Sequence, residues 1–196
     1  MKRRLLLTTP LAAALVLAGC KDAPSSGTPA KAAAVPVSIA AIEAEGKGFV
    51  LGSPMSVRTV YVFFDAQCSH CAALWRAAKP LKSQAKFVWM PVGILNKASE
   101  AQGAALLAAK DPVATMDEHE ASMNAKQGGI SATGDLDAQR EIVKKNTALM
   151  NRFGFASIPT VVGLHAQTGA LVSREGSMPT AELAALLGLQ VPAAGS

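Results

Sequence analysis

The stretch "SVRTVYVFFDAQCSHC", residues 56–71, constrains the fold more than any other part of the sequence. Its first ten residues are β-branched, aromatic and almost continuously apolar, which is typical of a short strand buried on both faces of a sheet. Cys68 and Cys71 follow, and the residues from the cysteines onward, "SHCAALWRAAKPLKSQA", have helical spacing, with Pro80 expected to kink the helix. The sequence therefore predicts a strand, a cysteine pair and a helix in immediate succession.

The N-terminus resembles a bacterial lipoprotein signal. "MKRR" is a basic start, an apolar stretch too short to span a bilayer follows, and "LAGC" ends it with small residues before a cysteine. The resemblance implies a signal peptide over residues 1–19 and a lipid on Cys20, with an ordinary cleaved signal as the alternative. Lys21, in place of an aspartate, favours the outer membrane as the site of the anchor.

An export signal would change the net charge of the mature protein and determine the compartment in which it works. Removing residues 1–19, which hold three basic residues and no acidic one, lowers the formal charge from +5 to +2. No basic cluster interleaved with aromatic residues remains, so a nucleic-acid partner is not expected. We expect a periplasmic protein, in an oxidising compartment where paired cysteines can form disulfides.

The rest of the chain is organised as a tether, one domain and a short tail. Residues 20–36 are rich in Ala, Pro, Ser and Gly and predict a flexible tether, and residues 191–196 form the tail. The elements expected in the domain, residues 37–190, are a short helix ending near Gly46, the strand and helix around the cysteines, a second strand in "KFVWMPVGIL", helices over about 97–153, a hairpin and a last helix. Asp111 and Pro112 predict a helix start, and Gly154 predicts a helix end.

The position of the cysteines predicts their chemistry. A cysteine at the start of a helix lies where free N–H groups and the helix dipole stabilise a thiolate, so Cys68 is the expected nucleophile. Cys71, one turn later on the same side, is the expected resolving thiol. Between them, His70 can place positive charge near the Cys68 sulfur and make the disulfide easier to reduce.

A cysteine pair of this spacing has three other uses in proteins. A disulfide closing so short a loop removes little chain entropy, which makes a purely structural role inefficient. Zinc in a structural site needs four ligands, and the chain has no second CxxC. Copper(I), held by the thiolates with His165 or a methionine, stays open as a non-enzymatic alternative.

His119 is expected on a solvated helix face, and Trp75 in the core.

A second motif, "SIPT", lies far along the chain. Proline is normally excluded from central strands, so a proline at the entrance of a strand after a helix needs an explanation. A cis peptide bond before the proline is the usual one. Together with the strand, the CxxC and the helix, Ile158-Pro159-Thr160 resembles the thioredoxin fold. The resemblance implies that Pro159 lies against the cysteine pair and that Ile158, with Thr160 beside it, binds the substrate chain by strand addition.

Two longer stretches narrow the resemblance. "VYVFFDAQCSHCAALWRAAKP" and "LLAAKDPVATMDEHEAS" are similar to the DsbC and DsbG family of periplasmic disulfide isomerases, with the DsbG branch most similar. The fold class that this implies is α/β, a thioredoxin fold with a helical subdomain inserted between the second core strand and the cis-Pro loop. The family acts on wrong disulfides of exported proteins and is kept reduced by a membrane electron donor of the DsbD type.

The sequence departs from that family in three places. Ser69-His70 between the cysteines ends in the histidine typical of the oxidase DsbA, and residue 158 is isoleucine where the isomerases commonly have threonine. Residues 22–56 have no room for the family's N-terminal dimerisation domain, so a monomer is expected. The prediction is a lipid-anchored thiol:disulfide oxidoreductase, a reductase or isomerase, that needs no cofactor or metal. The alternatives are a DsbA-like oxidase and a copper-handling lipoprotein.

Overall fold

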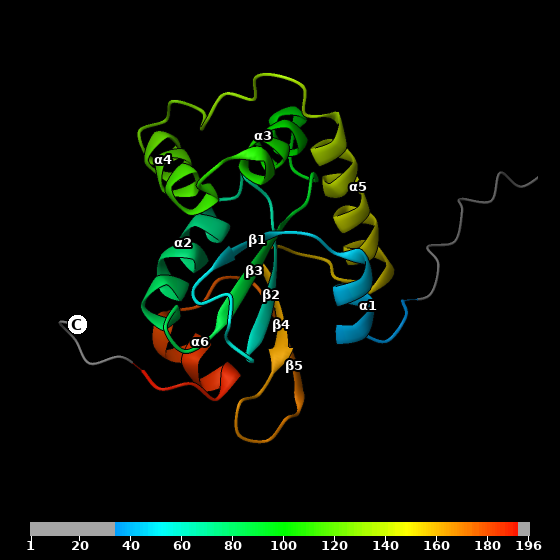
Figure 1. Cartoon of the computed structure of the whole chain (residues 1–196), viewed down its shortest axis with the longest axis vertical. Coiled ribbons are helices and arrows are strands. Elements are labelled where there is room, and N and C mark those ends of the chain that lie inside the picture. The colour runs from blue at the N-terminus through cyan, green and yellow to red at the C-terminus, as the bar shows by residue number, and fades with distance from the viewer. Residues whose placement is uncertain (1–33, 192–196) are drawn as a thin grey trace, which may run out of the picture. The chain divides into compact units, whose positions relative to one another are not determined.

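The computed structural model describes residues 34–191, which form a five-stranded sheet with helices on both faces (Figure 1). The predicted signal peptide, Cys20, most of the tether and nearly all of the tail lie outside the described residues. Within the described residues, no helix combines the length and the apolar character that a membrane span requires.

The predicted strand before the cysteines is at the centre of the sheet. The strand order is β1-β3-β2-β4-β5; β2 and β3 run parallel, and the remaining neighbours are antiparallel. A parallel pair needs a crossover connection, and the helix after the cysteines supplies it. The strands are β1 (Phe49–Leu51), β2 (Thr59–Phe64), β3 (Lys86–Pro91), β4 (Thr160–Leu164) and β5 (Leu171–Glu175).

The edge strand β1 was not predicted. It has three residues, which is too short for an alternating pattern to be recognised in the sequence. Its pairing with β3 depends on a partner almost forty residues further along the chain, with Val50 opposite Val88. The strand is therefore a product of tertiary contact rather than of local preference.

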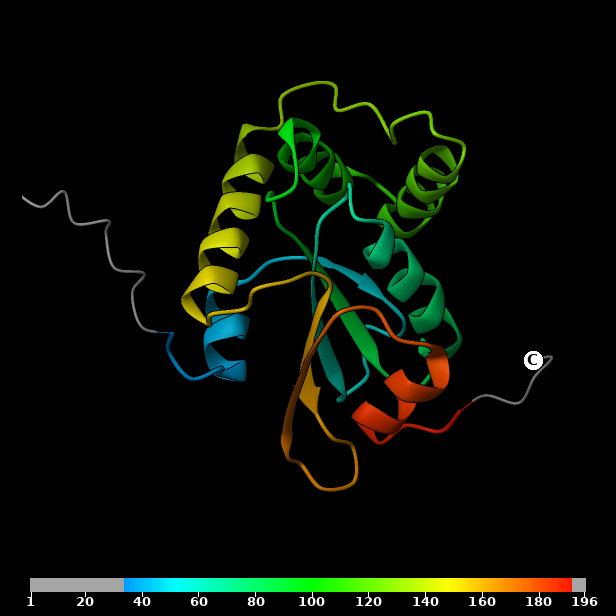
Figure 2. The ribbon, with the colours of Figure 1, turned by 180° about the vertical axis from the view of Figure 1, so that it is seen from behind.

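The helices cover the two faces of the sheet separately. Figure 1 shows α2, α4 and α6 on one side of the sheet and α1 and α5 on the other, and Figure 2 shows the same division from behind. The helices are α1 (Ile39–Glu45), α2 (Ser69–Ala78), the 3₁₀ turn η1 (Lys79–Leu81) at the predicted kink, α3 (Lys97–Ala108), α4 (Pro112–Asn124), α5 (Asp137–Arg152) and α6 (Thr180–Leu187).

Alternation along β2 gives each face its own core. Val62 packs with Trp75 of α2 in one buried cluster, and Phe63 packs with Leu149 of α5 in another. Successive side chains of a strand point to opposite faces, so a strand with both faces covered is apolar throughout. This is why the strand was recognisable as a continuous apolar run, and the prediction that Trp75 is a core residue is confirmed, since it is 1% exposed.

The helical block α3 to α5 lies between β3 and β4, as the predicted fold class requires. Asp111 caps α4, because its Oδ1 accepts a hydrogen bond from the Ala114 amide at 3.0 Å. At the other end of the block, Gly154 follows α5 with a φ of 76°, a conformation that favours glycine. The loop after Gly154 leads directly to the cis-proline segment. The helical block therefore ends near the end of the sheet at which the cysteines lie.

Candidate redox-active site

Cys68 is the N-cap residue of α2. The chain leaves β2, turns through a hydrogen bond from the Cys68 amide to the Asp65 carbonyl at 3.0 Å, and enters the helix. The Cys68 sulfur then accepts a hydrogen bond from the Cys71 amide at 3.3 Å, in the place where a capping oxygen usually stands. The sulfur therefore faces the free amides and the positive end of the helix dipole, an arrangement that stabilises a thiolate.

The two cysteines have opposite environments. The pKa of Cys68 falls to about 6: the hydrogen bond with the Cys71 thiol lowers it most, burial opposes, and the amides of Cys71 and His70 and the charge of His70 lower it further. Cys71 is fully buried, and burial, followed by its contact with Cys68, raises the pKa of its thiol far above the usual value. At neutral pH the reduced pair holds one thiolate at Cys68 and one thiol at Cys71.

The cis-proline loop faces Cys68. The Ile158–Pro159 peptide bond is cis, as predicted, and the Ile158 carbonyl lies 3.9 Å from the Cys68 sulfur. A cavity of about 350 Å³ opens there, lined by Gln67, Cys68, Ser69, His70, Ile94, Leu95, Ala156, Ser157 and Ile158. Thr160 is fully buried, and its hydroxyl donates to the Ser157 carbonyl at 2.6 Å, so it supports the loop from behind and does not line the cavity.

Asp65 builds the opposite wall of this cavity. Its buried carboxylate accepts hydrogen bonds from the amides of Gln67 at 2.9 Å, Ile94 at 2.8 Å and Leu95 at 3.1 Å. The bonds attach the loop after β3 to the turn before Cys68 and leave the side chains of Ile94 and Leu95 partly exposed beside it. Asp65 is not among the site residues predicted from the sequence, although a carboxylate at the end of a buried strand is itself a signal of a polar contact.

The prediction that His119 lies on a solvated helix face is wrong. The side chain is fully buried; its Nε2 lies 2.7 Å from the Ala66 carbonyl, and its Nδ1 accepts from the Ile130 amide at 3.2 Å. The ring therefore carries its proton on Nε2. Gly129 packs directly against the ring, where a Cβ atom would lie 2.5 Å from Cε1, so only glycine fits there. His119 joins the loop after α4 to the turn before Cys68.

Helix α4 is also attached to α2 through Asp117. Its carboxylate accepts from the Trp75 indole N–H at 2.7 Å and from the Lys79 ammonium at 2.6 Å. One turn along, Glu120 is 6% exposed, and its Oε2 finds no hydrogen-bond partner among the described residues. Burial raises the pKa of Glu120 to about 7, against the opposing charge of Arg76. The inserted helix thus places a carboxyl group that is easily protonated behind α2.

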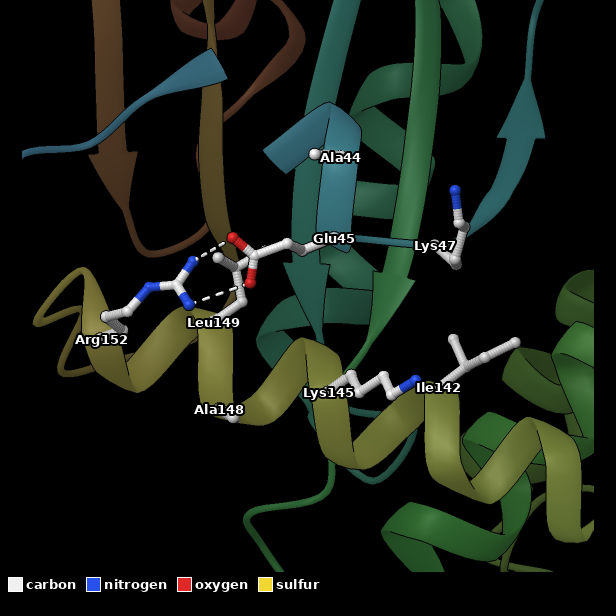
Figure 3. A pocket seen from close by; sticks show the side chains of 8 residues that line it. All are labelled: Ala44, Glu45, Lys47, Ile142, Lys145, Ala148, Leu149 and Arg152. Atoms are coloured by element: carbon white, nitrogen blue, oxygen red, sulfur yellow. Dashed lines mark hydrogen bonds and ion pairs between the residues drawn. The ribbon is translucent and has the colours of Figure 1, made fainter. Parts of the chain in front are cut away.

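A larger cavity, of about 680 Å³, lies between α1 and α5 (Figure 3). Its floor is aliphatic and its rim carries Lys47, Lys145 and a two-bond ion pair between Glu45 and Arg152, at 2.6 and 2.9 Å. It contains neither cysteine, and its charged groups are exposed on the surface, so we place the chemistry at Cys68.

His165 does not join the cysteines. It follows the far end of β4, whose first residue, Thr160, adjoins the cis-proline, and a strand of five residues spans roughly 16 Å. Within residues 34–191, no three side chains of His, Cys, Asp or Glu converge as ligands of one metal ion would. Of the residues proposed from the sequence, the structure brings together Cys68, Cys71, Ser69, His70, Ile158 and Pro159.

The position of Cys68, capping a helix after a central strand and facing a cis-proline loop, makes this a protein of the thioredoxin fold. The chain belongs to the thioredoxin-like domain family, whose model matches residues 54–190. The predicted membership of the thioredoxin superfamily is therefore confirmed.

The similarity to DsbG predicted from the sequence is also confirmed. The chain is 33% identical over 134 residues to a thiol:disulfide interchange protein DsbG of Pseudomonas aeruginosa, covering 67% of this chain and 51% of that protein. It is 32% identical over 104 residues to DsbG of Escherichia coli, covering 52% and 42%. The chain thus spans about half the length of these curated relatives.

Solved structures agree on the fold. A compact form of Proteus mirabilis ScsC has a TM-score of 0.59 at 14% identity, covering 81% of each chain. Pseudomonas aeruginosa DsbA2 has a TM-score of 0.58 at 19% identity, covering 70% of this chain and 91% of that one. At these identities the similarity concerns the fold alone.

Proposed function

We propose that the protein is a thiol:disulfide oxidoreductase that reduces or isomerises disulfides in exported proteins through Cys68 and Cys71. One observation carries the proposal: a thiolate at Cys68, with a pKa of about 6, opens into a cavity beside the cis-proline loop, while Cys71 is held behind it as a buried thiol. Similarity to proteins named for thiol:disulfide interchange supports the same activity.

The reaction is an exchange of disulfide bonds. The Cys68 thiolate attacks one sulfur of a substrate disulfide; a Cys68–substrate bond forms, the substrate S–S bond breaks, and the released substrate thiolate takes up a proton from water. Cys71 then loses its proton and attacks the Cys68 sulfur, which releases the second substrate thiol. The substrate gains two electrons, and the Cys68–Cys71 pair loses them.

Isomerisation uses the same first step. A second thiolate of the substrate attacks the mixed disulfide in place of Cys71, and Cys68 leaves as the thiolate with no net transfer of electrons. Continued reduction requires a dithiol donor, and we propose a membrane protein of the DsbD type for this role. The periplasmic location, the lipid anchor at Cys20 and the monomeric state expected from the sequence belong to the same proposal.

A DsbA-like oxidase is the second candidate. The low pKa of Cys68 favours it, since a stabilised thiolate stabilises the reduced pair and makes the disulfide a stronger oxidant. The two directions differ in reduction potential, which equilibration with glutathione measures. A potential near that of thioredoxin, about −270 mV, supports the reductase, whereas a more oxidising one, toward that of DsbA at about −120 mV, fits an isomerase as well as an oxidase. The resting redox state of the pair in cells separates those two, since an isomerase is kept reduced and an oxidase is kept oxidised.

The test of the exchange activity itself uses a disulfide substrate. Reduced protein should release free thiol from insulin or a disulfide-linked peptide and become oxidised at the Cys68–Cys71 pair, with one disulfide consumed for each pair formed. The variant Cys68→Ala should release none. Equal thiol release by the wild type and by Cys68→Ala would overturn the proposal.

A further inference from the structure

Glu175, the last residue of β5, holds the loop that faces Cys68. Its Oε2 accepts hydrogen bonds from the amides of Ala156 at 2.9 Å and Ser157 at 2.6 Å, and from the Ser157 hydroxyl at 2.9 Å. Ala156 and Ser157 are exposed and belong to no helix or strand. A carboxylate that accepts several donors forms strong, directional bonds, so this one side chain fixes the shape of the segment.

The next two residues also contact the site. The Gly176 amide donates to the Pro159 carbonyl at 2.7 Å, and the Ser177 hydroxyl lies 3.5 Å from Nδ1 of His70. Consecutive residues at the end of β5 therefore contact the loop before the cis-proline, the cis-proline itself and the helix that carries the cysteines. The end of this strand thus connects the cis-proline loop to the helix that carries the cysteines, although none of its three residues lines the cavity.

Glu175 contacts the loop at which a substrate would dock, but not the groups that set the reactivity of the Cys68 thiolate. Its bonds go to Ala156 and Ser157, whereas the groups that set the reactivity of Cys68 are Cys71 and His70. The loop wall is held by Glu175, and the opposite wall, Ile94 and Leu95, is held by the buried carboxylate of Asp65. Each of the two loops that line the cavity is thus held by hydrogen bonds from its amides to one carboxylate, Glu175 for one loop and Asp65 for the other.

We propose that Glu175 is a positioning residue for substrate docking, which holds Ala156 and Ser157 so that Ile158 presents its backbone to an extended peptide beside Cys68. Glu175 occupies the amides of Ala156 and Ser157, and the Thr160 hydroxyl occupies the Ser157 carbonyl, which leaves Ile158 as the residue beside Cys68 for main-chain pairing with the peptide. The peptide's apolar side chains can then contact Ile94 and Leu95, which line the same cavity. This inference deepens the proposed function and depends on it.

The test measures the rates at which Cys68 reacts with two reagents, in the wild type and in Glu175→Gln. The variant Glu182→Gln serves as the control. One reagent is a short uncharged peptide with an aliphatic residue beside its disulfide-bonded cysteine, which must dock; the other is iodoacetamide, which needs no docking. We expect Glu175→Gln to react about tenfold more slowly with the peptide, since it loses charge-assisted bonds, and within about twofold of the wild-type rate with iodoacetamide. Ser157→Ala, which loses one of the three bonds, should be intermediate.

The control removes a carboxylate from a neighbouring helix. Glu182 is 58% exposed and lies 3.7 Å from Arg174, so Glu182→Gln should leave both rates unchanged. Thermal unfolding verifies that each variant is folded, and Glu175 is exposed, so its substitution leaves the core intact.

Four outcomes of this experiment are informative. Slower reaction with the peptide alone supports the proposal. An unchanged peptide rate in a folded Glu175→Gln, or an equal loss with both reagents, overturns it, since the residue would then have no role or would act on the thiolate. A wild-type protein that reacts with iodoacetamide but never with the peptide disulfide overturns the proposed function, and this inference with it.

Discussion

The amide of Cys71 donates a hydrogen bond to the Cys68 sulfur over 3.3 Å, so the two members of the proposed redox pair are in direct contact. Cys68 is 8% exposed and reaches the cavity, whereas Cys71 is fully buried. A nucleophile must be ionised and accessible, and a resolving thiol must wait until a mixed disulfide has formed. The geometry gives each cysteine the environment that its step needs.

Removing the resolving thiol should trap the intermediate. Cys71→Ala is expected to accumulate disulfide-linked adducts between Cys68 and exported proteins, because no thiol remains to release them. Non-reducing gels followed by mass spectrometry detect the adducts. Cys68→Ala should show none, and identical gels for the two variants would argue against the exchange mechanism.

The reactivity of Cys68 should follow the titration of its thiolate. Its alkylation by iodoacetamide should be half-maximal near pH 6 and decline as the pH falls through that value, since the thiol form is unreactive. His70→Tyr should raise the pKa of Cys68 only modestly, by less than about one unit, because the helix amides remain. It should also make the pair more reducing. A half-maximal pH near 8.5, that of an ordinary thiol, would refute the stabilised thiolate.

Acid should destabilise the protein through His119. Burial lowers the pKa of this histidine below 6.5, so in the folded state it stays neutral where the unfolded chain takes up a proton. Stability should therefore fall as the pH drops below 6.5, with a slope of at most about 1.4 kcal/mol per pH unit. His119→Gln, measured by urea unfolding in a Cys68→Ala/Cys71→Ala background, should flatten this slope. His165→Gln serves as the control and should retain it, and a slope unaltered in His119→Gln would contradict the assignment.

Glu120 should act in the opposite direction. Burial raises its pKa from 4.5 to about 7, so the folded state holds a proton that the unfolded chain releases, and the stabilising effect of that proton is lost as the pH rises through 7. Glu120→Gln should therefore gain stability relative to the wild type between pH 5 and pH 8, by about 1–3 kcal/mol. Urea unfolding at the two pH values measures the difference. Glu118→Gln, on the exposed side of the same helix, should show no such gain.

Much of the fold could be predicted because its signals are local. The apolar run of β2 and the helical spacing after Cys68 depend on residues adjacent in the sequence. Asp111 before Pro112 is likewise a short-range cap signal, and the cap forms as expected. The cis bond before Pro159 was predicted from a single conflict, a proline at the entrance of a central strand.

The missed features all depend on long-range contacts. His119 is spaced like a surface residue of α4, but the loop around Ile130 folds over one side of its ring, and the turn before Cys68 brings the Ala66 carbonyl to the other ring nitrogen. Asp65 finds its amides at Ile94 and Leu95, almost thirty residues later, and Glu175 finds its own at Ala156 and Ser157 across the hairpin. No pattern along the chain reports which side chain will meet which amide after folding.

The pairing of Thr160 with Glu175 makes the position of Glu175 beside the candidate site depend on the length of a distant turn. The β4–β5 hairpin closes through Gly169, whose amide donates to the His165 carbonyl at 2.8 Å, at the end of the strands away from Cys68. One residue added to that turn, if absorbed by a slip of β5, would place Arg174 opposite Thr160 and turn every side chain of the strand to the other face. The loop beside Cys68 would then meet a cation in place of its carboxylate. If the loop docks substrates as proposed, insertions and deletions in this turn would tune substrate capture from a distance, without any change near the sulfur atoms.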